Sequence, residues 1–128
     1  MAHHEFRAAV ERADMDAAVT LLADDVVFRS PAVFKPYEGR ETVATILRTV
    51  FRVFEDFRYT DELEGDGIAA LLFEARVGDR SLQGIDLLRA DASGRITEFT
   101  VMIRPASGLI AVAERMGPAL EAAGVSMS

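Results

Sequence analysis

The first part of the chain carries apolar residues at the spacing of helices. One helical face is formed by Phe6, Ala9, Val10 and Ala13. Asp14, which follows, is a residue type favoured at the N-terminus of a second helix. We expect that helix to end at Asp24-Asp25, before a strand over Val26–Ser30 and a third helix that opens at Gly39. The residues expected to face the core from these helices are Phe6, Ala9, Val10, Ala13, Ala17, Ala18, Leu21, Leu22, Val43, Ile46, Leu47, Val50 and Phe54.

From residue 56 onward the apolar period changes from 3.6 to 2, which is typical of strands. Hairpin-type turns interrupt the alternation at Gly65–Gly67, Gly78-Asp79 and Asp91–Gly94. The pattern predicts an antiparallel meander followed by a C-terminal helix that breaks at Gly117-Pro118, with a frayed tail from Ala122. The strands of the meander are expected over Asp56–Glu64, Ile68–Val77, Arg80–Ala90 and Arg95–Arg104.

Helices followed by a meander indicate the α+β class, with the helices packed on one face of the sheet. The chain has 128 residues and half of them are apolar, which is enough for one core. No repeat or linker divides it, so we expect one domain over residues 1–128, with its core at about 5–117.

The turn at Gly78-Asp79 predicts the register of its hairpin and puts Leu71 opposite Asp86. The loop at 91–94 then predicts Phe99 beside Asp86. Two further pairs follow from the same register, Val101 with Gly84 and Ile103 with Leu82. One face of the meander is therefore apolar, and Asp86 is its only acid. The other members of that face are Ala69, Leu71, Phe73, Ala75, Leu82, Gly84, Leu88, Phe99, Val101 and Ile103.

Asp86 is the candidate catalytic residue. A carboxylate among apolar groups either stays protonated or finds donors, and a raised pKa suits a general acid or base near neutral pH. Two other interpretations remain open. Asp86 could pair structurally with a nearby arginine, tyrosine or backbone amide, or a register slip of one residue could turn it toward solvent.

Composition excludes several classes of function. The net charge of −7 argues against nucleic acid or an anionic membrane surface as partner. The absence of cysteine excludes disulfides, thiolate metal sites and a cysteine nucleophile. No apolar run approaches the roughly 20 residues of a membrane span, and no signal peptide is evident, so we expect a soluble, cytoplasmic protein. His3 and His4, without a third histidine, predict a solvated terminus and no metal site.

Several segments resemble nuclear transport factor 2-like proteins of the SnoaL-like and ketosteroid-isomerase-like branch. They are Asp16–Phe28, Glu38–Val43 and Gly94–Phe99. Met102–Leu109 with Ala113–Gly117 resembles a bacterial subgroup that has no assigned reaction. The resemblance implies a cone-shaped fold whose curved sheet encloses an apolar pocket. The residues we expect to line that pocket are Phe6, Phe28, Ser30, Ile46, Leu71, Phe73, Gly84, Phe99, Val101 and Ile103.

The residue set of ketosteroid isomerases is mostly missing. The place of their base, before the proline that follows the first strand, is held here by Ser30. The place of their oxyanion-binding tyrosine on the first helix is held by Phe6, which donates no hydrogen bond. Only their protonated aspartate has a counterpart, Asp86. We therefore do not expect ketosteroid isomerisation by that set of residues.

Other enzymes of this fold offer two further comparisons. The Asp-Arg-Asp set of its epoxide hydrolases could correspond in part to Glu74 and Arg76, but the register puts both on the face opposite Asp86. The resemblance to SnoaL-type polyketide cyclases implies a simpler arrangement, in which one pocket carboxylate moves protons without metal or cofactor. That arrangement fits Asp86, with Ser30 and either Tyr37 or Tyr59 as polar helpers.

Two classes of function follow. One is a cofactor-independent isomerase, cyclase or hydrolase that acts on a small apolar molecule through Asp86. The other is a non-catalytic module that binds such a molecule or serves as a dimeric interaction domain. The outer face of the meander is partly apolar, and the resemblance implies a homodimer through it, unless the C-terminal helix covers it. Its apolar or weakly polar members are Leu72, Ile85, Leu87, Thr100 and Met102.

Overall fold

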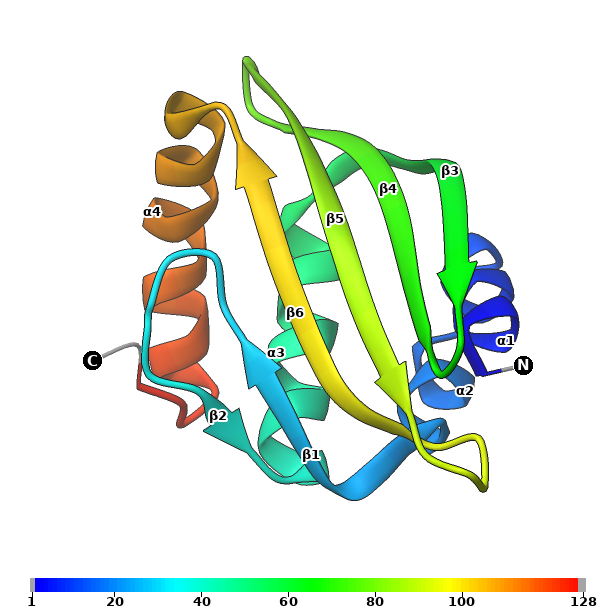
Figure 1. Cartoon of the computed structure of the whole chain (residues 1–128). Coiled ribbons are helices and arrows are strands. Elements are labelled where there is room, and N and C mark those ends of the chain that lie inside the picture. The colour runs from blue at the N-terminus through cyan, green and yellow to red at the C-terminus, as the bar shows by residue number, and fades with distance from the viewer. Residues whose placement is uncertain (1, 127–128) are drawn as a thin grey trace.

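The computed structural model describes residues 2–126, which form helices packed on one sheet. The elements are α1 (Ala2–Glu11), α2 (Met15–Thr20), β1 (Leu22–Arg29), β2 (Tyr37–Glu38), α3 (Arg40–Val53), β3 (Glu55–Gly65), β4 (Ile68–Val77), β5 (Arg80–Ala90), β6 (Ile96–Arg104) and α4 (Ala106–Ala122). The sheet has six strands in the order β2-β1-β6-β5-β4-β3 (Figure 1). The predicted α+β class is confirmed.

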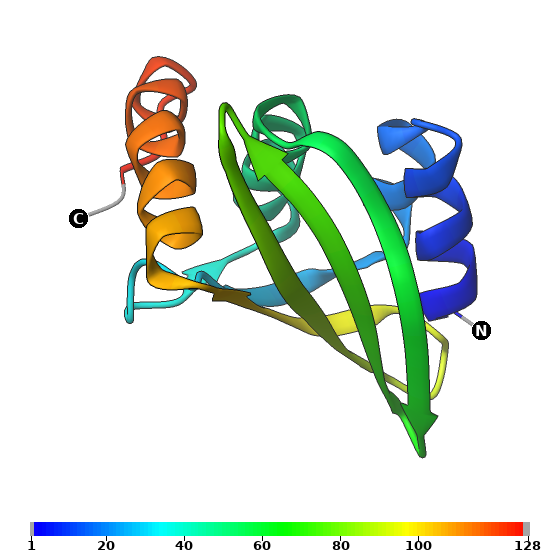
Figure 2. The ribbon, with the colours of Figure 1, turned by 90° about the horizontal axis from the view of Figure 1, so that it is seen from above.

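The sheet is curved, and the helices lie on its concave side (Figure 2). α3 crosses this concave face, α1 and α2 lie beside the β3 end of the molecule, and α4 lies beside α3 at the other end. Among residues 2–126, no helix is both long enough and apolar enough to cross a membrane. The arrangement leaves the convex face of the sheet without a covering helix from the described part of the chain (Figure 1).

The meander formed by β3 to β6 confirms the predicted strands to within one residue at each end. Gly78 has a positive φ of 60°, which the tight β4–β5 turn requires and which glycine adopts without strain. The register of that hairpin is as predicted, with Leu71 opposite Asp86. The period-2 pattern and one glycine turn therefore determine which face Asp86 occupies.

The predicted register between β5 and β6 is wrong by two residues. Val101, and not Phe99, lies opposite Asp86, while Phe99 pairs with Leu88 and Ile103 with Gly84. Half of the error comes from the loop, because β6 begins at Ile96, which pairs with Ala90. The other half comes from an irregularity between Arg89 and Ala90. A shift of two residues leaves every side chain on its predicted face, so the apolar face itself is unaffected.

The predicted boundary between the second helix and the first strand is also wrong. α2 ends at Thr20, and β1 begins at Leu22, which is fully buried. The exposed Asp24 and Asp25 lie in an irregular stretch of β1, between the residues that pair with β6 at Leu22 and at Val27. The two aspartates therefore belong to a bulged strand and not to a helix end.

The C-terminal helix does not break at Gly117-Pro118. α4 continues through Pro118, because its buried face holds it against the rest of the core on both sides of the proline. Proline donates no hydrogen bond to the carbonyl of Glu114, but Glu114 is exposed, so water can bond that carbonyl. The tail predicted to fray is held as far as Ser126, whose carbonyl accepts a hydrogen bond from Tyr37. Residues 127–128 lie outside the described residues.

The core fills the space between the concave face of the sheet and the helices. Phe6 packs edge-on against Phe99, with 5.3 Å between the ring centroids. Gly84 lies beneath the ring of Phe73, and a Cβ atom added at Gly84 would collide with that ring and with the carbonyl of Met102. The β5 strand therefore needs glycine there for the aromatic side chain to pack against it.

Candidate functional site

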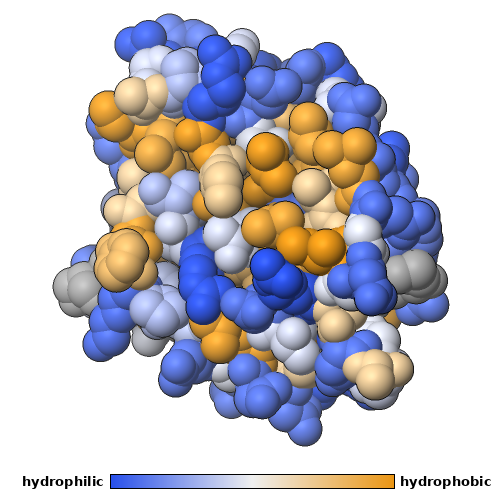
Figure 3. Space-filling view, viewed as in Figure 1, coloured by the Kyte–Doolittle hydropathy of each residue, from blue (hydrophilic) through white to orange (hydrophobic). Residues whose placement is uncertain are grey.

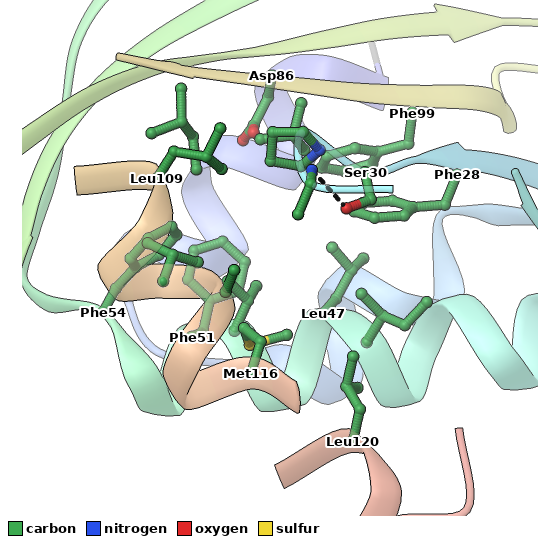
Figure 4. Close-up of a pocket in the computed structure, with 18 of the residues that line it drawn as sticks. Phe28, Ser30, Leu47, Phe51, Phe54, Asp86, Phe99, Leu109, Met116 and Leu120 are labelled. Atoms are coloured by element: carbon green, nitrogen blue, oxygen red, sulfur yellow. Dashed lines mark hydrogen bonds between the residues drawn. The ribbon is translucent and has the colours of Figure 1, made fainter. Parts of the chain in front are cut away.

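An apolar cavity of about 50 Å³ lies between the concave face of the sheet, α3 and α4 (Figure 4). Strands β1, β5 and β6 supply one wall, the loop after β1 supplies a second, and the two helices close the others. The lining residues are Phe28, Ser30, Pro31, Ala32, Tyr37, Ile46, Leu47, Val50, Phe51, Phe54, Phe57, Asp86, Phe99, Val101, Ile103, Leu109, Val112, Ala113, Met116 and Leu120.

Asp86 is the one charged residue in this lining. It belongs to β5, its side chain points from the sheet toward the helices (Figure 4), and it is 4% exposed. No arginine, lysine or histidine forms an ion pair with it among residues 2–126. Its charge is therefore left without a cationic partner, and hydrogen bonds have to compensate for its burial.

The hydrogen bond to Asp86 comes from Tyr59. Its hydroxyl donates to Asp86 Oδ2 over 3.0 Å, and Tyr59 is itself buried. Tyr59 pairs with Phe73, which pairs with Gly84, two residues from Asp86 on the same face. The phenol therefore reaches Asp86 diagonally across β4.

Burial controls the pKa values of this pair. Burial raises the pKa of Asp86 to about 7, although the Tyr59 hydrogen bond opposes the rise. Burial also raises the pKa of Tyr59 well above its usual value, and the adjacent Asp86 charge raises it further. Tyr59 therefore remains a protonated donor, while Asp86 is populated in both protonation states near neutral pH.

Six of the residues predicted to line the pocket do line the cavity: Phe28, Ser30, Ile46, Phe99, Val101 and Ile103. Four others require correction, because Phe6, Leu71, Phe73 and Gly84 lie in the packed core beside the cavity and not in its lining. Ser30 is already engaged as an acceptor, since its Oγ receives a hydrogen bond from the amide of Ala32 over 3.0 Å.

Several residues that close the cavity from the helical side were not predicted to line it. Phe51 comes from α3, Phe54 is the residue that follows α3, and Leu109, Met116 and Leu120 come from α4 (Figure 4). All five are apolar, and Phe54 was already expected to face the core. That signal identifies them as buried, but it does not separate cavity-lining positions from packed ones.

Two other expectations concern charged residues. Glu74 and Arg76 lie on the convex side, where they pair with Arg58 and with Glu55 and Asp56, so they contribute nothing to the cavity. The prediction of a solvated N-terminus is wrong for His3, which is 5% exposed.

The fold and its cavity place the protein in the class of α+β domains of the nuclear transport factor 2-like, or cystatin-like, kind. A nuclear transport factor 2-like protein of unknown function from Cytophaga hutchinsonii has this fold, with a TM-score of 0.65 and 19% identity over 83% of this chain and 89% of its own. Within this class, the chain belongs to the SnoaL-like family, because residues 3–99 match the model of the SnoaL-like domain.

Two solved structures are much more similar. A protein from Pseudomonas aeruginosa described as a steroid delta-isomerase is 45% identical, with a TM-score of 0.91 over 95% of this chain and 90% of its own. An uncharacterized bacterial protein with a cystatin-like fold from Silicibacter pomeroyi is 31% identical, with a TM-score of 0.89 over 94% of this chain and 85% of its own. Among curated proteins, none matches this sequence significantly.

Proposed function

We propose that this protein binds a small, mostly apolar molecule that carries a carbonyl oxygen, and that Asp86 exchanges a proton with it. The observation that carries the proposal is a lone carboxyl group in the lining of an apolar cavity, with a pKa of about 7. General acid–base catalysis requires such a group near the pH at which the enzyme works. The 45% identity to a protein described as a steroid delta-isomerase supports proton-transfer chemistry.

One carboxyl group can act as both base and acid in an isomerisation. Ionised Asp86 takes a proton from the carbon next to the ligand carbonyl, the double bond shifts, and protonated Asp86 returns the proton to a different carbon. Tyr59 stabilises the ionised form by donating to Oδ2. The proton that is removed is returned, so this reaction requires no metal, cofactor or redox partner. It also requires no base at position 30 and no tyrosine at position 6, where the chain has Ser30 and Phe6.

The size of the cavity limits the substrate. About 50 Å³ is far below the roughly 300–1,000 Å³ typical of ligand pockets. A ligand with more than a few non-hydrogen atoms therefore requires lining side chains to move. Met116, on α4, is the most adaptable of them, because its side chain is long and unbranched. A compact cyclic ketone fits these limits better than a steroid does.

The test compares wild type with Asp86→Asn on two probes, a β,γ-unsaturated cyclic ketone and a β,γ-unsaturated ketosteroid. Conversion to the conjugated ketone is followed by ultraviolet absorbance. We expect Asp86→Asn to lower turnover by at least about 100-fold, the usual contribution of a positioned acid or base. Asp79→Asn, at a fully exposed turn position, is the control and should leave turnover unchanged. Equal turnover of Asp86→Asn and wild type would contradict the proposal.

A second candidate function is binding without turnover. The narrowness of the cavity and its single charged group favour it, because little is available there to stabilise a second developing charge. In that case the cyclic ketone should raise the melting temperature of wild type and of Asp86→Asn alike, and no conjugated product should form with either protein.

We also propose that the chain forms a homodimer through the convex face of the sheet. Apolar side chains gather over part of this face (Figure 3), and Met102 there is more than half exposed. α4, the alternative cover, packs on the opposite side of the sheet. Light scattering after gel filtration should give the mass of a dimer for wild type and of a monomer for Met102→Glu. A monomeric wild type would refute the proposal.

A further inference from the structure

A cluster of two histidines and two glutamates lies at the end of the molecule away from α4. His3 and His4 come from the first turn of α1, and Glu62 and Glu64 come from β3, which runs beside that helix (Figure 1). One ligand atom each from His3, His4 and Glu64 lie within 4.8 Å of one another. Residues far apart in the chain thus converge on one point, and none of them belongs to the cavity that contains Asp86.

His3 carries the strongest indication that a ligand belongs here. Its Nε2 atom is buried and makes no hydrogen bond with any of residues 2–126. Glu64 Oε2 lies 2.7 Å from it, close enough for a contact but not aligned for a hydrogen bond. A buried ring nitrogen without a hydrogen bond is costly, and a metal ion between the nitrogen and the carboxylate would satisfy both.

Two of the donor spacings bracket the value for a tetrahedral metal ion, and all three donors lie within 4.8 Å of one another. Ligands about 2.0–2.1 Å from a tetrahedral zinc ion lie roughly 3.3 Å from one another. Glu64 Oε2 lies 2.7 Å from His3 Nε2 and 3.7 Å from His4 Nε2, on either side of that value. Small rotations of half-exposed side chains, those of His4 and Glu64, would equalise the distances.

Glu62 contacts His4, and Arg7 in turn holds Glu62 in place. Glu62 Oε2 lies 2.8 Å from His4 Nδ1, the nitrogen that faces away from Glu64. The other oxygen of Glu62 accepts a hydrogen bond from Arg7 Nη1 over 2.9 Å. A carboxylate beside the unused nitrogen of a metal-binding histidine is the usual second partner in such sites, because it orients the ring.

We propose that His3 Nε2, His4 Nε2 and Glu64 Oε2 bind a divalent transition metal ion of the Zn²⁺ class, with Glu62 as a positioning residue. Two imidazoles and a carboxylate suit Zn²⁺, whereas Mg²⁺ and Ca²⁺ require oxygen ligands. Three protein ligands leave a fourth position for water or for Glu62. The ion would tie the first turn of α1 to the end of β3.

The test measures Zn²⁺ binding by the full chain. The protein is first treated with a chelator to remove bound metal, and the chelator is then removed by dialysis. Competition with a chromogenic chelator gives the affinity and the number of ions per chain, and thermal unfolding with and without Zn²⁺ gives an independent readout. We expect one ion per chain and a higher melting temperature with Zn²⁺. His4→Ala and Glu64→Gln should each weaken binding at least tenfold, on the order of the loss seen even for outer partners of metal ligands.

The variants are chosen so that a folding defect does not obscure the result. His4 and Glu64 are half-exposed, whereas substitution of the buried His3 could disturb α1. Glu5→Gln, an exposed position on the same helix, is the matched control and should bind Zn²⁺ as wild type does. No uptake by wild type, or equal affinity in wild type and both variants, would mean that the cluster holds ion pairs only and would overturn the proposal.

Discussion

Two carboxylates of the same sheet, Asp86 and Glu55, occupy opposite electrostatic environments. Asp86 lies on the concave face, is buried, and receives a hydrogen bond from Tyr59. Glu55, at the start of β3, accepts hydrogen bonds from Arg76 and from the amide of Gly78. Burial raises the pKa of Asp86, whereas the Gly78 amide, followed by the charge of Arg76, lowers the pKa of Glu55.

The difference shows what separates a structural carboxylate from a chemically useful one in this fold. Glu55 is partly exposed and has donors for both oxygens, so it stays ionised and joins β3 to the β4–β5 turn. In the described part of the chain, Asp86 has one neutral donor and no cation, so its proton is exchangeable near neutral pH. The cost of keeping Asp86 unpaired falls on stability, and that cost can be measured.

The largest effect is expected for Asp86→Asn. The folded state retains the Asp86 proton up to about pH 7, whereas the unfolded chain releases it near the ordinary value of 3.8. Wild type therefore loses stability as pH rises from 3.8 to about 7, and the neutral variant does not. Relative to wild type, Asp86→Asn should gain up to about 4 kcal/mol between about pH 4 and about pH 8.

Urea unfolding of both proteins across this pH range measures that gain. The difference between the two proteins is the quantity to follow, because other carboxylates change the stability of both by the same amount. A difference that stays constant with pH would mean that Asp86 is not buried as a neutral acid, and the contrast with Glu55 would disappear.

A smaller effect is expected for Tyr59→Phe. Loss of the hydroxyl removes the one hydrogen bond that lowers the pKa of Asp86, so that pKa should rise further. Stability should fall by about 1 kcal/mol, the usual value of one hydrogen bond, and more at high pH, where the ionised carboxylate loses its donor. Titration of the Asp86 carboxyl by NMR gives the pKa directly, and an unchanged value would show that Tyr59 is not its partner in solution.

The smallest effect is expected for Glu55→Gln, and it should depend on pH in the opposite sense. The folded pKa of Glu55 is lowered, so its contribution is present above the unfolded value of 4.5 and is lost as pH falls through the folded pKa. The variant should therefore melt slightly below wild type at neutral pH and together with it in acid. Solvent and salt weaken such partly exposed pairs, so high salt should reduce the difference.

The side of the sheet on which Asp86 lies could be predicted from sequence because two local rules determine it. The Gly78-Asp79 turn sets the pairing of β4 with β5, and strict alternation then assigns every side chain to a face. The same alternation made the face insensitive to the two-residue error between β5 and β6. The C-terminal helix was located correctly, but packing against the core overrides the break expected at Pro118.

Sequence could not identify the partner of Asp86 or the boundary of the cavity. β3 contains two irregularities, before Arg58 and after Tyr59, so alternation alone does not say where Tyr59 points. Whether an apolar side chain lines a cavity or fills the core depends on how the aromatic residues pack, and not on their spacing. The burial of His3 depends on contact between α1 and β3, which no local pattern records.

The pairing of β1 with β6 has a consequence for synthesis of the protein. β1 is made early, but its long partner in the sheet is the last strand, and Phe28 lies beside Phe99. Apart from the short β2, β1 has no neighbour in the sheet until β6 is available. The sheet therefore cannot be completed while β6 is still in the ribosome, because β1 joins the other long strands through β6. Such distant pairing slows folding, and it leaves the edge of β1 unpaired until β6 arrives.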